Sequence, residues 1–321
     1  MTTSSNKKAV SPTAGGLLIV FSLLLSSCVG PSQRVDFSTV DLPRQKEIAA
    51  APFFPQERYQ CGPAALAMVL VQSNAQTSPK QLVGQVYVPG RKGSLQTEMV
   101  ATARRYNRVA YVLDPDLLNL LREVSDGKAV LVMQNLGLKI FPKWHYAVVV
   151  GYNLETSKLI LRSGVDRRKI VSFKLFDRTW RRSGRWAVVI TSADEVPVTA
   201  KEQNYLMAIL PFEHNRQWQT ANLAYRTASK KWPGSIGAHM GLGNTFYHLA
   251  QLTKAEQSYR KALLLDHDHA PAHNNLAQVL LETNRFDEAK RHALQAVRLG
   301  GPHVDVYAKT LAEIEKRMHD K

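Results

Sequence analysis

Apolar residues follow two different patterns in the first two thirds of the chain. From residue 61 to about 126 they recur at helical spacing, whereas from 129 to 191 short β-branched and aromatic runs predict strands. The predicted helices are Cys61–Leu70, Ser78–Val88, Leu95–Tyr106, Asp116–Val124 and Lys174–Trp180. The predicted strands are Ala129–Gln134, His145–Tyr152, Leu159–Arg162, Ile170–Phe173 and Trp186–Thr191. The pattern therefore predicts an α+β domain at 51–195 with an antiparallel sheet.

A third pattern begins near residue 202 and returns every 34 residues. The matching pairs are Leu242 and Leu276, Gly243 and Ala277, Ala255 and Ala289, and Ala262 and Ala296. Small residues at such positions let antiparallel helices approach closely. The period predicts an all-α solenoid with a degenerate repeat at 202–235, repeats at 236–269 and 270–303, and a capping helix at Val304–Met318. It resembles the tetratricopeptide-repeat family, whose arrays bind peptides or partner proteins on a concave face.

The first residues have the composition of a targeting segment. Lys7 and Lys8 precede an apolar run, Gly16–Leu25, that is too short to span a bilayer as a stable helix. Leu-Ser-Ser-Cys follows and resembles the bacterial lipoprotein signal, which implies a signal peptide at 1–27 and a lipid on Cys28. By resemblance to Gram-negative lipoproteins, Val rather than Asp at position 29 favours the outer membrane, facing the periplasm. An ordinary secretory signal and an uncleaved anchor are the alternatives, and residues 28–50 are interpreted as a tether.

The formal charge of +16 is unusual, but it does not indicate a nucleic-acid partner. The basic residues are spread along the chain, and no DNA- or RNA-binding motif accompanies them. A basic surface suits an anionic envelope or an acidic partner equally well.

Cys61 is the one cysteine besides Cys28, so a lipidated Cys28 leaves it without a disulfide partner. A lone thiol in an oxidising compartment is either buried or chemically employed. Cys61 begins a predicted apolar helix with Pro63 in its first turn, and the positive end of a helix dipole favours thiolate. Gly62 permits close backbone approach, so a substrate carbonyl could reach both the sulfur and the backbone N–H groups there.

A cysteine nucleophile requires a base, and His145 is the strongest candidate because it begins a predicted strand. A structural histidine at a strand end is the alternative. The other interesting histidines, His239 and His273, share one repeat position, but they lack the thiol or carboxylate neighbours of a metal site. The sequence predicts neither a metal nor a cofactor.

The string from Gln56 to Met68, followed by His145-Tyr146-Ala147-Val148-Val149-Val150-Gly151-Tyr152, resembles the bacteriocin-processing, double-glycine-type peptidase family of papain-like fold. The resemblance covers residues 50 to 191 approximately. It implies that Cys61 is the nucleophile, that His145 is the general base and that Gln56 lines the oxyanion hole. Gln60 competes with Gln56, which lies five residues before Cys61 where the family more often shows six.

The third member of the family's triad, an Asp or Asn that orients the histidine, is missing from its expected place near Ser163. Asp166, in a predicted loop three residues further on, is the first choice, and Asn153 is the reserve. Otherwise the enzyme works as a dyad, or the domain has lost activity and retains only a binding cleft.

These observations favour an envelope-anchored, papain-like cysteine peptidase that cleaves a peptide or protein, with repeats that recruit a protein partner. A catalytically silent adaptor is a second hypothesis. A third is another Cys/His acyl transfer on cell-wall or protein peptides, because it requires the same nucleophile and base.

Overall fold

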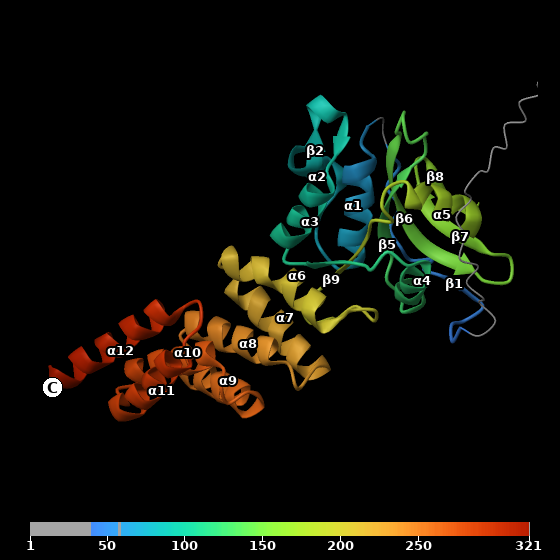
Figure 1. Cartoon of the computed structure of the whole chain (residues 1–321). Coiled ribbons are helices and arrows are strands. Elements are labelled where there is room, and N and C mark those ends of the chain that lie inside the picture. The colour runs from blue at the N-terminus through green and yellow to red at the C-terminus, as the bar shows by residue number, and fades with distance from the viewer. Residues whose placement is uncertain (1–39, 57–58, 321) are drawn as a thin grey trace, which may run out of the picture. The chain divides into compact units, whose positions relative to one another are not determined.

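The computed structural model describes residues 40–56 and 59–320, and Figure 1 shows how their helices and strands are arranged. The described elements lie in one compact unit, Asp41–Lys321. A chain that begins at Asp41 therefore contains every described element. The predicted signal peptide and the predicted lipidation site, Cys28, lie outside the described residues.

An antiparallel sheet forms the centre of the first domain, as the sequence predicted. Among the described residues the sheet has seven strands in the order β4-β9-β5-β6-β7-β8, with β1 paired to β6. The strands are β1 (Gln45–Glu47), β4 (Val109–Val112), β5 (Val130–Asn135), β6 (Trp144–Asn153), β7 (Lys158–Ser163), β8 (Asp166–Ser172) and β9 (Ala187–Thr191). A separate hairpin consists of β2 (Tyr87–Val88), the 3-10 turn η2 (Pro89–Arg91) and β3 (Gly93–Ser94).

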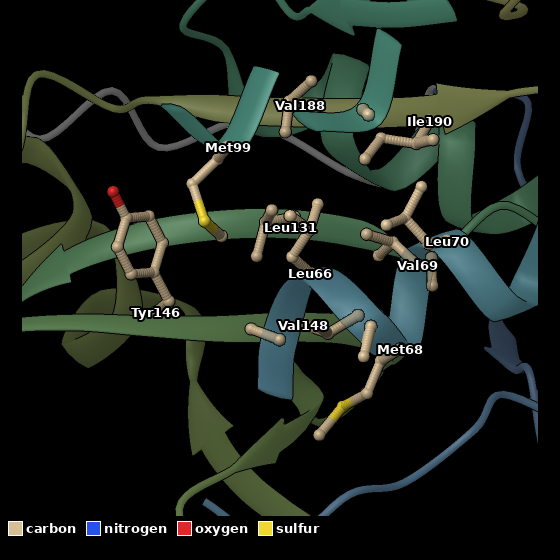
Figure 2. Close-up of a cluster of buried hydrophobic side chains, with 14 of the residues drawn as sticks. Leu66, Met68, Val69, Leu70, Met99, Leu131, Tyr146, Val148, Val188 and Ile190 are labelled. Carbon is tan, nitrogen blue, oxygen red and sulfur yellow. The ribbon is translucent and has the colours of Figure 1, made fainter. Parts of the chain in front are cut away.

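Helix α1 (Cys61–Gln72) is the central helix of this domain. Its residues from Gly62 to Leu70 are all buried, as expected for a helix that is apolar nearly all round. Figure 2 shows Leu66 of α1 beside Leu131 of β5, in a cluster that also contains Val69, Val148 and Met99. The other helices here are α2 (Pro79–Val86), α3 (Gln96–Arg105), α4 (Leu117–Ser125) and α5 (Phe173–Arg181).

Two strands of the seven-stranded sheet were not predicted, and neither were the short strands β2 and β3. β4 lies in the region that the sequence pattern assigned mainly to helices. It was not predicted because a run of four residues is too short to show a period. Its partner β9 lies about eighty residues later, where Val109 pairs with Thr191. β1 lies inside the predicted tether and pairs Gln45 with Asn153, so the tether prediction up to residue 50 extended too far.

Seven helices follow the sheet domain within the described residues. They are α6 (Glu202–His214), α7 (Trp218–Lys231), α8 (Ile236–His248), α9 (Leu252–Leu265), α10 (Ala270–Glu282), α11 (Phe286–Leu299) and α12 (Val304–His319). The turn within each helix pair contains one non-glycine residue with positive φ: Arg216 at 56°, Ala250 at 56° and Asn284 at 60°. These three positions are spaced by the same period as the sequence repeat, so the backbone follows the repeat as well.

Candidate functional site

A cleft of about 1130 Å³ opens at the end of the sheet where α1 and β6 begin. The cleft is lined by Gln56, Tyr59, Cys61, Arg91, Lys92, Gly93, Ser94, Leu95, Gln96, Met133, Pro142, Lys143, Trp144, His145, Tyr146, Gly164 and Ser183. The lining includes the β2–β3 hairpin, the first residues of α1 and of β6, and parts of several connections. The candidate nucleophile Cys61, the candidate base His145 and Gln56 therefore share one cavity.

Cys61 is the first residue of α1, which places its sulfur at the N-terminus of a buried helix. The neighbouring Gly62 permits the cleft wall to approach this helix end. A Cβ on Gly62 would lie 2.1 Å from Ser94 Oγ and 2.6 Å from Ser94 Cβ. Tyr146 fixes this wall, because its hydroxyl donates a hydrogen bond of 3.1 Å to the Ser94 carbonyl. A glycine is thus required beside the thiol.

Burial raises the pKa of the Cys61 thiol above its ordinary value. Backbone hydrogen bonds from Tyr146, Gly62 and Cys61 itself lower this pKa, but they do not outweigh burial. The net direction is opposite to the one that the helix end alone predicts. The resting sulfur is therefore a thiol whose nearby N–H groups would stabilise negative charge once it develops.

His145 is the second residue of β6, after Trp144, and its ring contacts Ser163. The distance between His145 Nε2 and Ser163 Oγ is 2.8 Å, and the Ser163 residue is buried at the end of β7. Burial, followed by the positive charges of Lys169 and Lys143, lowers the pKa of His145 to about 4. The imidazole is therefore neutral at pH 7. Because Ser163 engages Nε2, Nδ1 is the ring nitrogen that Ser163 does not hold.

Gln56 connects β6 to the turn after β7 through its side-chain amide. Its Nε2 donates a hydrogen bond of 3.1 Å to the Tyr146 carbonyl, and its Oε1 accepts one of 2.9 Å from the Gly164 N–H. The Gln56 backbone N–H also donates to the Gly164 carbonyl, at 3.0 Å. This amide is fixed in the cleft wall, and an Nε2 group has a second hydrogen that it can donate. Its oxyanion role stays a prediction.

Among the described residues, the hydrogen-bond partner of the His145 ring is Ser163 rather than Asp166 or Asn153. Asp166 is the first residue of β8 rather than a loop residue, and its side chain is half exposed and 3.9 Å from Lys169 Nζ. Asn153 ends β6, about 26 Å along the strand from His145. Asn153 donates to Gln45 and accepts a hydrogen bond from the Thr156 N–H. The ring partner that the structure provides is Ser163, at the place where the family pattern led one to expect a carboxylate.

Histidines in the repeats have a structural environment. His239 Nε2 lies 3.1 Å from the Pro233 carbonyl, and His273 Nε2 lies 2.9 Å from the His267 carbonyl. In both repeats the histidine at this position therefore contacts the carbonyl of the residue six positions earlier. His273 Nδ1 also lies 2.9 Å from His292 Nδ1. No group of three or more His, Cys, Asp or Glu that could hold a metal ion occurs in residues 40–56 and 59–320.

The fold and the cleft together define a peptidase-like domain that is followed by helical repeats. Residues 40–188 match the model of the Peptidase_C39 like family, and residues 236–269 and 258–291 match tetratricopeptide-repeat models. The chain therefore contains a Peptidase_C39-like domain followed by tetratricopeptide repeats, and such repeats bind proteins or peptides. Both parts of the predicted fold class are confirmed.

Type IV pilus assembly protein PilF of Pseudomonas aeruginosa is a distant relative of the repeats. It is 30% identical over 113 residues, which cover 33% of this chain and 45% of PilF. The chain thus spans less than half the length of this relative.

Two solved structures of repeat proteins are similar to part of the chain. A PilF structure from Pseudomonas aeruginosa is 27% identical with a TM-score of 0.35, covering 37% of this chain and 54% of that one. The Yersinia enterocolitica chaperone SycD, in complex with a peptide of the translocator YopD, is 16% identical with a TM-score of 0.34, covering 36% of this chain and 93% of that one.

None of the helices in the described part of the chain is long and apolar enough to span a membrane.

Proposed function

We propose that this protein is a cysteine peptidase in which Cys61 is the nucleophile and His145 is the general base. The observation that carries the proposal is that both residues line one cleft, each at the start of its element, α1 and β6. The match of residues 40–188 to a peptidase family supports the same chemistry. The substrate is a peptide or protein, and the tetratricopeptide repeats recruit a protein partner or deliver the substrate by raising its local concentration.

The proposed reaction is acyl transfer through a thioester. The Cys61 sulfur attacks the scissile carbonyl carbon while the thiol proton passes to His145 Nδ1. The backbone N–H groups of Tyr146 and Gly62 near the sulfur, with the amide of Gln56, stabilise the oxyanion. The C–N bond then breaks as His145 returns the proton to the leaving amine, and water hydrolyses the thioester.

Ser163 is a positioning residue in this mechanism. For Nδ1 to accept the thiol proton, the neutral ring must carry its hydrogen on Nε2, which donates it to Ser163 Oγ. A neutral hydroxyl orients the ring but does not stabilise imidazolium as a carboxylate would. The raised pKa of Cys61 and the lowered pKa of His145 both favour the neutral pair at rest. Proton transfer is therefore expected during the attack rather than before it.

The first experiment uses thiol alkylation and peptide cleavage in the same preparations. Iodoacetamide labelling of Cys61 is followed against pH in the chain from Asp41 to Lys321 and in its His145→Ala variant. We expect the thiol to titrate above its ordinary pKa of about 8.5. A mixed library of quenched fluorescent peptides is expected to be cleaved by the wild type and not by Cys61→Ser. Cleavage that persists in Cys61→Ser would refute the proposal.

A second candidate function is a catalytically silent adaptor, and one observation favours it. Within the described residues, the cleft brings no carboxylate into contact with the His145 ring, and the lysines near the ring oppose its protonation. An adaptor would retain the cleft for binding. It predicts a peptide that binds in the cleft with equal affinity in the wild type and in Cys61→Ser, and no cleavage by either.

Acyl transfer to an acceptor other than water is distinguished from hydrolysis by adding amines and analysing the products by mass spectrometry.

We further propose that the protein is attached to the bacterial envelope by a lipid on Cys28, at the outer membrane and facing the periplasm. The proposal rests on the basic residues, the short apolar run and the Leu-Ser-Ser-Cys string of the N-terminal sequence. Metabolic labelling with a palmitate analogue is expected to mark the wild type and not Cys28→Ala. Equal labelling of both, or recovery of the wild type away from the membrane fraction, would refute it.

A further inference from the structure

Four large apolar side chains lie exposed on one short segment at the mouth of the cleft. Leu138 is 62% exposed, Ile140 76%, Phe141 75% and Trp144 52%. They belong to the β5–β6 connection and to the first residue of β6, and residues 136–144 are called the apolar loop below. Val165, 77% exposed, is in the turn between β7 and β8, at the same end of the sheet by strand register. Several large apolar side chains exposed on one short segment favour an interaction site.

The backbone of the apolar loop is held in place, so the exposure is built into the fold. Asn135 Oδ1 accepts hydrogen bonds of 2.9 Å from the N–H groups of both Gly137 and Lys143. The Leu136 N–H donates to the Lys143 carbonyl at 2.9 Å, and the Arg182 guanidinium donates to the Gly137 carbonyl. A Cβ on Gly137 would lie 2.3 Å from the Phe141 carbonyl oxygen, so the loop closes tightly around this glycine.

The charges around the apolar loop are positive. Lys139 and Lys143 alternate with the apolar side chains and are exposed, as are Arg91 and Lys92 on the opposite rim of the cleft. None of these four forms an ion pair with a carboxylate in residues 40–56 and 59–320. Exposed Phe, Ile and Trp interleaved with lysine is the composition of segments that enter the interface of anionic bilayers.

We infer that the apolar loop inserts into an anionic lipid surface and so brings the mouth of the cleft to the membrane. A lipid surface is favoured over a peptide because Leu138, Ile140 and Phe141 are largely exposed and do not line the cleft. A peptide ligand is usually bound in a concave groove, where the apolar side chains of the receptor are half buried. Tryptophan at the boundary, as Trp144 is here at the base of the loop, is the usual residue of the headgroup region.

The N-terminal attachment is compatible with this orientation. The described part of the chain begins at residue 40, close in sequence to β1, which pairs with the end of β6 opposite to Trp144. Strand β6 spans about 33 Å. The seventeen or so residues from Cys28 to Gln45 can extend over at most about 60 Å. An anchor on Cys28 could therefore reach the bilayer that the apolar loop contacts, although insertion of the loop does not require it.

The test is vesicle co-sedimentation of the chain from Asp41 to Lys321, which contains every described element and lacks the N-terminal apolar run. Vesicles are made of phosphatidylcholine alone or mixed with phosphatidylglycerol. The variants are Ile140→Ser with Phe141→Ser and, as the matched control on the repeats, Met207→Ser with Leu264→Ser, whose side chains are 62% and 68% exposed. Thermal midpoints are measured for each variant.

We expect the wild type and the control to bind the mixed vesicles, and the loop variant to bind at least about tenfold more weakly. Lys139→Gln with Lys143→Gln should abolish the preference for phosphatidylglycerol. Equal binding by wild type and loop variant would overturn the inference, as would wild-type chain that binds neither vesicle. A loop variant that binds vesicles normally but has a raised KM for peptides would assign the loop to substrate instead. Cys61→Ser should bind like the wild type, so a failure of the peptidase proposal is seen separately.

Discussion

His145 in the cleft and His292 in the repeats share one electrostatic property and differ in everything else. Burial lowers the pKa of each to about 4. His145 has the Ser163 hydroxyl on one ring nitrogen, and it lines the same cleft of about 1130 Å³ as a thiol at a helix N-terminus. Beside His292 lies another imidazole, that of His273. A shifted pKa identifies a buried histidine, whereas the neighbours determine whether the histidine has chemistry to perform.

The largest expected difference between the two histidines is in catalysis. His145→Ala should reduce kcat/KM for peptide cleavage by about a thousandfold or more, because the thiol loses its base and the leaving amine loses its acid. His292→Ala should leave cleavage unchanged. The two variants are compared at matched folded fractions, determined by circular dichroism. Equal losses in both would mean that His145 acts only through stability.

Two glycines extend the comparison to packing. A Cβ on Gly62 meets Ser94 at 2.1 Å, and a Cβ on Gly243 meets the Tyr259 ring at 2.3 Å. Each alanine variant should lower the free energy of unfolding by about 1–3 kcal/mol. Gly62→Ala should in addition reduce cleavage by folded protein, because the displaced Ser94 belongs to the cleft wall.

The control for these glycines is Gly84→Ala in α2, where a Cβ meets nothing within 4 Å. A helix-interior alanine at such a site should stabilise by about 0.5–1 kcal/mol. Urea unfolding measures all three variants. If Gly243→Ala impaired cleavage as much as Gly62→Ala, the assignment of the cleft wall to Gly62 would be wrong.

Changing Ser163 should alter the cleft by a smaller factor. Ser163→Ala removes the ring partner of Nε2 and should lower kcat about tenfold with little change in KM. Ser163→Asp supplies the missing carboxylate. Its charge should raise the pKa of His145 and shift the acid limb of the pH profile of kcat/KM upward. If the pH profiles of kcat/KM of the wild type and of Ser163→Asp coincide and Ser163→Ala has normal activity, this serine does not position the base.

The smallest expected effect is the pH dependence of stability. An unfolded histidine titrates near pH 6.5, while His145 and His292 have their pKa values lowered to about 4 in the folded chain. The unfolded state therefore binds more protons below pH 6.5, and stability should be lost as the pH falls from about 6.5 toward 4. His292→Gln should reduce this loss, as followed by urea midpoints at pH 7 and pH 5. A larger loss in the variant would contradict the sign.

Much of the fold could be predicted because it leaves a local signal. The period of the repeats fixes the positions of small residues, and the apolar residues around α1 predict its burial. β4 could not be predicted, since four residues carry no period and its partner β9 is distant in sequence. The site was predicted in part for the same reason. Cys61 and His145 could be selected because each lies at the start of a predicted helix or strand. The contact of Ser163 with the His145 ring depends on strand register, which the sequence does not show.

Asp166 illustrates the limit of arguing from residue type alone. A carboxylate was the natural choice to orient an imidazole, and Asp166 was the nearest one in sequence to the expected place. The structure pairs Ser163 with Asp166 across the β7–β8 turn, and the half-exposed carboxylate lies near Lys169. The chain reversal at Gly164, with φ of 63°, turns the strand back and keeps the serine at the ring.

The left-handed turns at Arg216, Ala250 and Asn284 carry a consequence for how this molecule can vary. Each turn has nearly the same φ at one non-glycine residue, so the array can grow or shrink by whole helix pairs while both of its ends keep their shape. The length of the partner-binding surface is therefore free to change over evolution or by design, one 34-residue module at a time, without any substitution in the domain that holds Cys61.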